Sequence, residues 1–140
     1  MIKKLVYWAA ASCLVMWMVS CASSKKVTVE DLNGEWTMVT VDGKTMQDTE
    51  EQPAPFIGFD AAEKRVYGNA GCNLIVGVLK VKNETIDLSD LGSTMMACPD
   101  AETETLVFNT LATVKTFKRE GDKLMLLNGE GKVVTELVKK

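Results

Sequence analysis

Two cysteines at predicted turns are the residues of this chain best suited to chemistry. Cys72 stands in the segment GNAGCN, directly before the apolar residues 74–76, and Cys98 immediately precedes Pro99. Such a pair can form a disulfide, supply a reactive thiol, or bind a soft metal ion. The compartment decides among these alternatives, because disulfides persist in oxidising surroundings and free thiols persist in reducing ones.

The N-terminal segment predicts export from the cytoplasm. Lys3 and Lys4 give it a positive start, and residues 5–19 form an uncharged run that is shorter than a membrane-spanning helix of ~20 residues. The run ends in Met18-Val19-Ser20-Cys21, which resembles the lipobox of bacterial lipoproteins. That resemblance implies cleavage before Cys21 and acylation of both its sulfur and its new amino group.

We therefore expect a lipoprotein signal peptide over residues 1–20, a lipidated tether over residues 21–30 and one domain over residues 31–140. Cys13 also follows small residues, but cleavage there would leave a long apolar start on the mature chain. Two or three acyl chains anchor a protein stably. No aspartate follows Cys21 and no acidic run lies nearby, so we expect attachment to the periplasmic face of the outer membrane.

Composition narrows the classes of partner. Removal of the leader leaves 120 residues, which carry 14 of the 16 basic side chains and all 19 acidic ones, a net charge of about −5. Nucleic-acid binding needs a basic surface, so we expect no nucleic-acid partner. The 140 residues include no histidine, which is the commonest general base and metal ligand. We expect no cofactor, no metal and a monomer.

A structural disulfide is the favoured use of the two remaining cysteines. Cys13 leaves with the leader and Cys21 carries lipid, so Cys72 and Cys98 form an even pair in an oxidising compartment. Closing the loop of about 26 residues between them would stabilise the fold by roughly 3.5 kcal/mol on the chain-entropy model. In this interpretation Gly71 allows a close backbone approach, and Asn73 stabilises the turn.

Two chemical alternatives stay open at this point. One is a thiol-redox module that uses Cys72 and Cys98, and the other is a Cu(I) site that adds Met95 or Met96. Adjacent residues of an extended segment point to opposite faces, so we expect one methionine in the core and the other at a rim.

Hydrolytic chemistry is the weakest alternative. A serine triad needs histidine, which the chain lacks. Carboxylate pairs exist at Asp87 and Asp90 and at Glu102 and Glu104, but such charges are usually solvated. We therefore expect that the protein is not an enzyme.

Residue periodicity predicts a mostly β fold with one helix. Val107, Leu111 and Val114 recur at helical spacing and predict a helix from about Asp100 to Thr113. Short runs of β-branched and aromatic residues predict about eight strands, over residues 37–41, 56–59, 65–68, 73–82, 84–88, 115–119, 123–127 and 132–138. The fourth run shifts its alternation and suggests a bulge near Gly77. Tight turns make the strands antiparallel, so the expected α+β fold is a strongly curved sheet or cracked β-barrel closed by the helix.

The order of three short motifs resembles the META domain family of HslJ-like proteins. The chain carries LNGEW at residues 32–36, GNAGCN at 68–73 and TMMACP at 94–99. The resemblance extends from Asp31 to Leu137, and the motif residues that it marks are Gly34, Trp36, Gly68, Gly71, Cys72, Asn73, Gly77, Thr94, Met95, Cys98 and Pro99. Many members of the family carry arginine where Met95 stands, so any role of that arginine does not carry over.

The resemblance implies a β-rich, barrel-like domain with one helix. It also implies a small envelope protein, often a lipoprotein, that is linked to stress or antibiotic tolerance and has no established chemistry. The one ligand site that we expect is an apolar cavity under the helix, lined by some of Trp36, Phe59, Phe108 and Leu111.

We therefore expect a non-enzymatic accessory factor for envelope integrity under stress, bound to the membrane through its lipid and binding a protein or apolar small-molecule partner. A lipid carrier is the further alternative, and it needs a cavity deep enough for an acyl chain.

Overall fold

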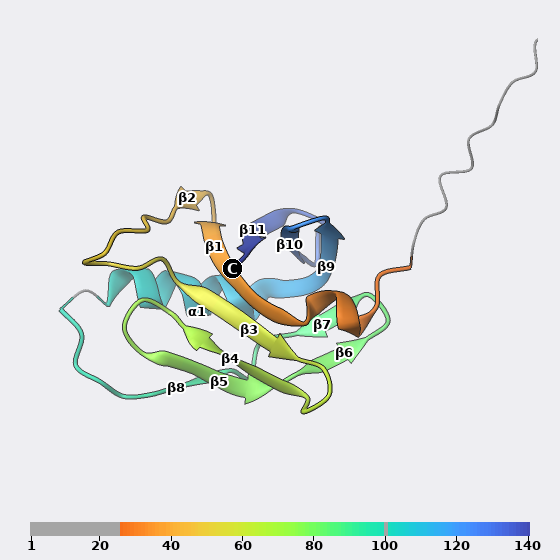
Figure 1. The fold of residues 1–140 in the computed structure, drawn as a ribbon, viewed down its shortest axis with the longest axis horizontal. Coiled ribbons are helices and arrows are strands. Elements are labelled where there is room, and N and C mark those ends of the chain that lie inside the picture. The colour runs from red at the N-terminus through yellow and green to blue at the C-terminus, as the bar shows by residue number, and fades with distance from the viewer. Residues whose placement is uncertain (1–25, 100) are drawn as a thin grey trace, which may run out of the picture.

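The computed structural model describes residues 26–99 and 101–140, which form one curved antiparallel sheet with an α-helix packed against it (Figure 1). The chain runs in the order η1 (Val29–Leu32), β1 (Gly34–Val41), β2 (Lys44–Thr45), β3 (Phe56–Asp60), β4 (Arg65–Asn69), β5 (Leu74–Val78), β6 (Lys80–Lys82), β7 (Thr85–Asp87), β8 (Gly92–Ser93), α1 (Glu102–Thr113), β9 (Val114–Glu120), β10 (Lys123–Asn128) and β11 (Val133–Lys139). This architecture confirms the predicted fold class. The strands missed by the sequence, β2 and β8, are only two residues long.

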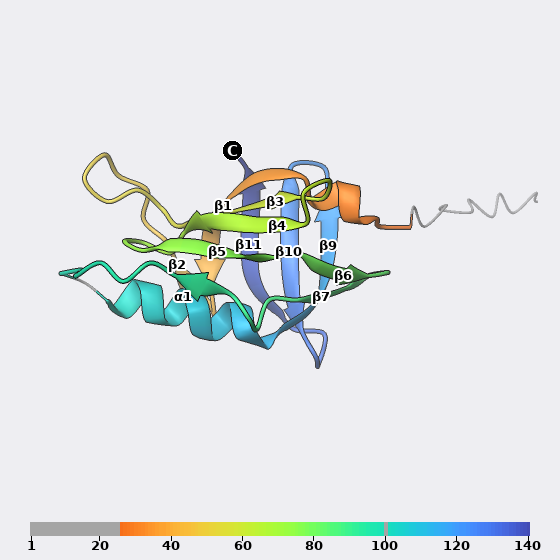
Figure 2. The ribbon, with the colours of Figure 1, turned by 90° about the horizontal axis from the view of Figure 1, so that it is seen from below.

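The strands pair in the order β6-β7-β9-β10-β11-β1-β3-β4-β5-β8, with β2 attached to β1. Most pairings join strands that follow one another along the chain, and the C-terminal β11 joins β10 to the N-terminal β1. Register shifts interrupt the pairing of β1 with β11 and of β10 with both of its neighbours. Such irregularities increase twist, and they bend the sheet so that its two halves cross steeply (Figure 2).

The sheet curls until its two edges are joined by the chain itself. β5 lies beside the edge strand β8, yet it continues through Leu79 directly into β6 at the opposite edge. The prediction of one strand over residues 73–82 is therefore wrong, and the irregularity that was predicted near Gly77 lies at Leu79. Pairing stays regular across Gly77 and breaks at Leu79, whose side chain turns into the core while its N–H donates to Lys64.

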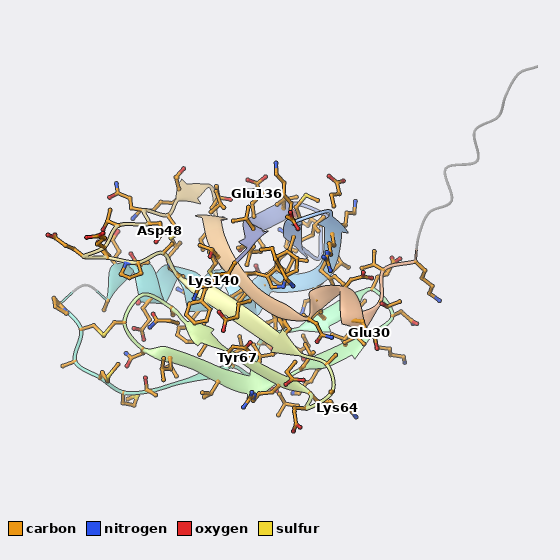
Figure 3. The ribbon with its side chains drawn as sticks, in the orientation of Figure 1. Glu30, Asp48, Lys64, Tyr67, Glu136 and Lys140 are labelled. Atoms are coloured by element: carbon orange, nitrogen blue, oxygen red, sulfur yellow. A yellow bond between two sulfur atoms is a disulfide. The ribbon has the colours of Figure 1, made fainter. Side chains whose placement is uncertain are left out.

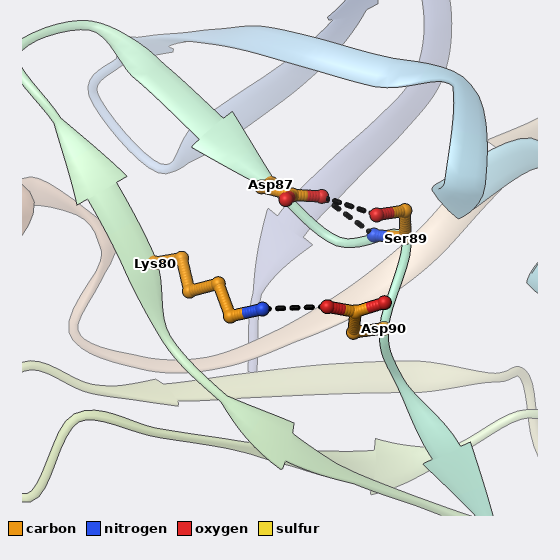
Figure 4. Close-up of polar contacts among 4 residues, drawn as sticks. All are labelled: Lys80, Asp87, Ser89 and Asp90. Atoms are coloured by element: carbon orange, nitrogen blue, oxygen red, sulfur yellow. Dashed lines mark hydrogen bonds and ion pairs between the residues drawn. The ribbon is translucent and has the colours of Figure 1, made fainter.

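Polar contacts hold the segment that crosses between these edges (Figure 4). The Lys80 ammonium on β6 donates to Asp90, 2.6 Å away, which raises the pKa of Lys80. Asp87 accepts from the hydroxyl and the N–H of Ser89, at 2.6 and 3.0 Å, which lowers the pKa of Asp87. These contacts hold the segment that leads from β7 to β8 and attach it to β6 through Lys80.

The helix covers the concave side of the sheet (Figure 2). Its apolar face contributes Val107 and Leu111 to a core cluster that also holds Trp36, Phe59 and Phe117. The helix begins at Glu102, with Ala101 as N-cap and no side-chain cap, which is later than the predicted start. The predicted first residue, Asp100, lies outside the described residues.

Among the residues that the structure describes, no helix has the length and apolar character needed to cross a bilayer.

Candidate functional site

The two cysteines that were predicted to pair, Cys72 and Cys98, lie together at one end of the sheet. Cys72 lies in the turn between β4 and β5, and Cys98 lies in the loop that leads from β8 to α1. They form a disulfide with a Cα–Cα distance of 6.1 Å across a separation of 26 residues. This confirms the predicted bridge, and both cysteines are half-buried.

Asn73 is buried beside the disulfide and connects three segments. Its side-chain oxygen accepts from the Thr94 hydroxyl at 3.0 Å and from the Met96 N–H at 2.7 Å. Its amide group donates to both carboxylate oxygens of Glu104, each 3.0 Å away, and approaches the Met96 carbonyl at 3.3 Å. The side chain thus uses both its donor and its acceptor capacity, since an amide carries an acceptor oxygen and an NH₂ group with two donor hydrogens.

Sequence reasoning missed the roles of Asn73 and Glu104. The sequence placed Asn73 in a local turn and Glu104 among solvated charges near the helix start. The partly buried Glu104 instead accepts from the backbone and the side chain of Asn73, a residue 31 positions earlier. No sequence signal marks this pairing, because neither residue lies near the other along the chain.

The disulfide and Glu104 form the only cluster with metal-ligand character that we find among the described residues. Ligand atoms of Cys72, Cys98 and Glu104 all lie within 4.8 Å of one another. Metal ions bind thiolates, and a disulfide offers none, so this cluster would need reduction before it could hold a soft metal. The Cu(I) and redox alternatives therefore depend on a chemical state that differs from the bridged one.

The glycines of the GNAGCN motif permit tight backbone packing. Gly71 has φ +124°, a conformation that side chains rarely adopt, and its N–H donates to Asn69 at 2.8 Å. A Cβ at Gly68 would overlap the carbonyl oxygen of Phe56 on the neighbouring strand. These glycines let the turn approach β3 and place Cys72 beside the loop before α1.

The LNGEW motif builds the opposite end of the core. Trp36 is fully buried, and its indole N–H donates to the Leu32 carbonyl at 2.6 Å. The cations of Lys139 and Arg119 lie 4.5 and 5.3 Å from its ring centroid. Burial lowers the pKa of Lys139, and the charge of Arg119 lowers it further.

Gly34 has a related structural role. It adopts φ +103°, and a Cβ there would lie 2.5 Å from the Lys139 ammonium. The Lys139 ammonium donates to the carbonyl of Asn33, the residue before Gly34. The side-chain oxygen of Asn33 accepts from the N–H of Ala61 at 2.7 Å. The motif therefore locks the start of β1 onto β11 and the turn after β3.

The residues of the predicted apolar cavity belong to the core. Trp36, Phe59 and Leu111 are essentially inaccessible members of the main cluster, and the partly buried Phe108 packs against it. Two adjoining surface hollows, of about 200 and 350 Å³, share Pro53 and Gly71 instead. None of the four residues lines either hollow, and the cavity stays a prediction.

The methionines depart from expectation. Met95 is 95% exposed and Met96 is 55% exposed, so the prediction that one would pack in the core is wrong. The preceding residue, Thr94, pairs with Leu74 through backbone and hydroxyl contacts of 3.2 and 2.9 Å. This pairing, together with Asn73, holds residues 95 and 96 beside the start of β5 and leaves their side chains in solvent.

An exposed apolar strip runs from these methionines along β5. Alternate β5 side chains Leu74, Val76 and Val78 are 47%, 49% and 61% exposed, because they face away from the core. We define the apolar strip as Leu74, Val76, Val78, Met95 and Met96. Gly77, between two of them, faces inward where a Cβ would lie 2.6 Å from Leu91.

The remaining predicted residues lie as follows. Pro99 is exposed and directly follows the bridged Cys98. The predicted lipidation site, Cys21, lies outside the described residues.

Comparison with known proteins identifies a matching family and solved structures with a similar fold. The META domain profile matches residues 27–140. A protein solved by NMR is similar at 21% identity and TM-score 0.62, covering 80% of this chain and 94% of its own. A second NMR structure, from Burkholderia xenovorans, has 17% identity and TM-score 0.63, with coverage of 80% and 86%.

A crystal structure of a DUF4847 family protein from Bacteroides vulgatus has 14% identity and TM-score 0.53, covering 78% of this chain and 94% of its own. These identities support the fold alone. No curated protein matches the chain.

Removal of the disulfide should weaken the fold without abolishing it. Replacement of Cys72 and Cys98 together by serine opens a loop of 26 residues. We expect the free energy of unfolding to fall by about 3.5 kcal/mol, measured by urea denaturation. The wild type should alkylate at these positions only after reduction, as mass spectrometry would show. Free alkylation of the native protein would contradict the bridge.

The Asn73–Glu104 pair should be essential to the same end of the molecule. Asn73→Asp keeps the shape but sets one carboxylate against another, and we expect a loss of about 3 kcal/mol in unfolding free energy. Combining it with Glu104→Gln should recover more than half of that loss. Asn109→Asp, on the exposed side of α1, is the control and should change stability little. Equal effects of the two aspartates would refute the role of Asn73.

Proposed function

This chain belongs to the META domain family, since that profile covers residues 27–140, and we propose that it is a non-enzymatic envelope lipoprotein that acts by binding an apolar partner. Its role is that of an accessory factor that supports envelope integrity under stress. The observation that carries the proposal is the apolar strip, because exposed apolar patches on small proteins usually mark interaction sites.

The chemistry of the domain supports binding over catalysis. Its two cysteines are joined, and the chain has no histidine to act as a general base. The exposed Asp90 is paired with Lys80, and Asp87 accepts from Ser89, so both carboxylates hold the segment between β7 and β8. Glu104 is occupied by Asn73. The polar groups that could form a reactive site therefore stabilise loops.

The leader supports the proposed location. The segment that ends in Cys21 predicts acylation, and the following Ala22-Ser23-Ser24 carries no inner-membrane retention aspartate. The protein would then be anchored by its lipid to the periplasmic face of the outer membrane. Such surroundings are oxidising, in agreement with the Cys72–Cys98 bridge.

Anchoring depends on Cys21 in this proposal. In cells that express the full chain, Cys21→Ser should reduce the acylated, membrane-bound fraction at least about tenfold. Cys13→Ser is the matched control, because that cysteine lies in the leader, and it should leave acylation unchanged. Intact mass separates an acylated mature chain from a chain that keeps its leader. An unacylated wild type, or loss of acylation in the Cys13 variant, would overturn the proposed anchor.

The apolar strip should be needed for the envelope role. A strain that lacks this protein should be more sensitive to detergent stress, and the wild-type chain should restore growth. Val76→Asp combined with Val78→Asp should fail to restore it, since two charges interrupt the strip. Val133→Asp changes an exposed valine at the start of β11 and should restore growth fully. Full restoration by the double variant would show that the strip is not the functional surface.

A further inference from the structure

We propose that the apolar strip docks on the phospholipid surface of the membrane that carries the anchor. The domain would then lie against the bilayer, held by its lipid at one point and by the strip at a second. This inference rests on the proposed function and names the apolar partner of the same surface.

The shape of the surrounding face suits a planar partner. Val76 pairs with Tyr67 on β4, which in turn pairs with Gly58 on β3, and these residues share the outward face. The Tyr67 ring lies close over Gly58, where a Cβ would overlap it, so no side chain rises from that position. Figure 3 shows Tyr67 on this side of the molecule, away from α1. Small ligands need a concave site, whereas this face is the outside of a curled sheet.

The side chains of the strip are suited to shallow insertion among lipids. Met95 and Met96 are unbranched and follow an edge strand at a loop, where they are the most exposed and the third most exposed members of the strip. Asn73 and the Cys98 bridge fix the backbone on both sides of them. A loop that presents flexible apolar side chains from a fixed backbone can enter an interface at low entropic cost.

The rim of the strip carries groups that favour the headgroup region. Arg65 is the strand partner of Val78, and its guanidinium lies 5.3 Å from the centroid of the Tyr67 ring. Arginine and tyrosine both place an apolar body beside lipid chains and a polar end beside phosphates. Asp60, across the sheet from Arg65, accepts from the N–H of Glu63 at 3.0 Å. Lys80, just beyond Val78, is paired with Asp90.

The length of the tether favours the bilayer over other occupants. Seven residues lie between Cys21 and Val29, where η1 begins, and the eight Cα–Cα steps across them span at most about 28 Å. Lipid is therefore present at an effective concentration of roughly millimolar or more, so a weak apolar contact is enough. Both views show β5 running toward the end of the molecule from which the described N-terminal residues leave (Figures 1 and 2). The Val78 end of the strip thus lies toward the tether and the methionine end, after β8, lies away from it, so that contact along the whole strip needs the domain to lie flat on the membrane that holds the anchor.

Vesicle binding by an unacylated chain tests this inference. The mature chain, residues 21–140 with Cys21→Ser, would be secreted behind an ordinary cleavable leader and mixed with vesicles of phosphatidylethanolamine and phosphatidylglycerol at roughly 3:1. We expect it to sediment with the vesicles. Val76→Asp with Val78→Asp, and separately Met95→Ser with Met96→Ser, should each weaken partitioning at least about fivefold. Val133→Asp is the matched control and should bind like the parent.

The methionine variant keeps the test independent of folding. Its side chains lie outside the core, so its urea midpoint and disulfide should equal those of the parent. Raising the salt to about 0.5 M should change the parent's binding less than twofold, because apolar contact is not screened.

Three results would overturn the inference. The first is an unacylated parent that does not bind vesicles, and the second is binding that both strip variants retain. The third is a parent that forms dimers or captures a protein through the strip while ignoring lipid, which would assign the surface to a second copy or another protein. None of these results bears on acylation of Cys21, so the proposed anchor stands or falls by its own experiment.

Discussion

The amide side chain of Asn73 is the contact on which the disulfide-bridged end of this protein depends. Asn73 belongs to the turn before β5 and is buried where this turn meets the loop after β8 and the first turn of α1, and its side chain bonds to both of these other segments. The adjacent disulfide joins the first two of these segments covalently. The disulfide connects only these two segments, whereas the amide also bonds to Glu104 on α1. Together they determine where Met95 and Met96 stand and how the helix begins.

The same end of the sheet presents the apolar strip because β5 has two unlike faces. Ile75 points into the core, and its neighbours Leu74 and Val76 point outward with about half of their surface in water. A strand that needed only to stabilise the fold would carry polar residues on that outer face. The chain therefore carries an apolar surface directly beside a loop whose backbone is held in place. This combination is what the proposed membrane contact explains.

The sheet also shows how a short chain closes a barrel without completing it. Leu79 turns inward and lets one continuous segment form both β6, the strand at one edge, and β5, the neighbour of the strand at the other edge. The alternation of residues 73–82 indicated extended chain correctly, but it held no information about which neighbours each half would pair with. The helix begins at Glu102, later than predicted. The sequence gives no sign of this boundary, because the N-cap residue Ala101 has no side chain that could cap the helix.

Sequence patterns predicted the class of the fold, showed the motifs that resemble the META domain, and favoured a bridge between Cys72 and Cys98. Local periodicity, short motifs and the count of cysteines are enough for these predictions, because they need no knowledge of distant contacts. Tertiary structure alone decided that Asn73 binds Glu104, that both methionines are exposed, and that the strip lies on the outer face beside Tyr67. These outcomes depend on which segments, tens of residues apart, become neighbours when the sheet curls. Periodicity specifies that a side chain faces one of two sides, and only packing decides which side meets water.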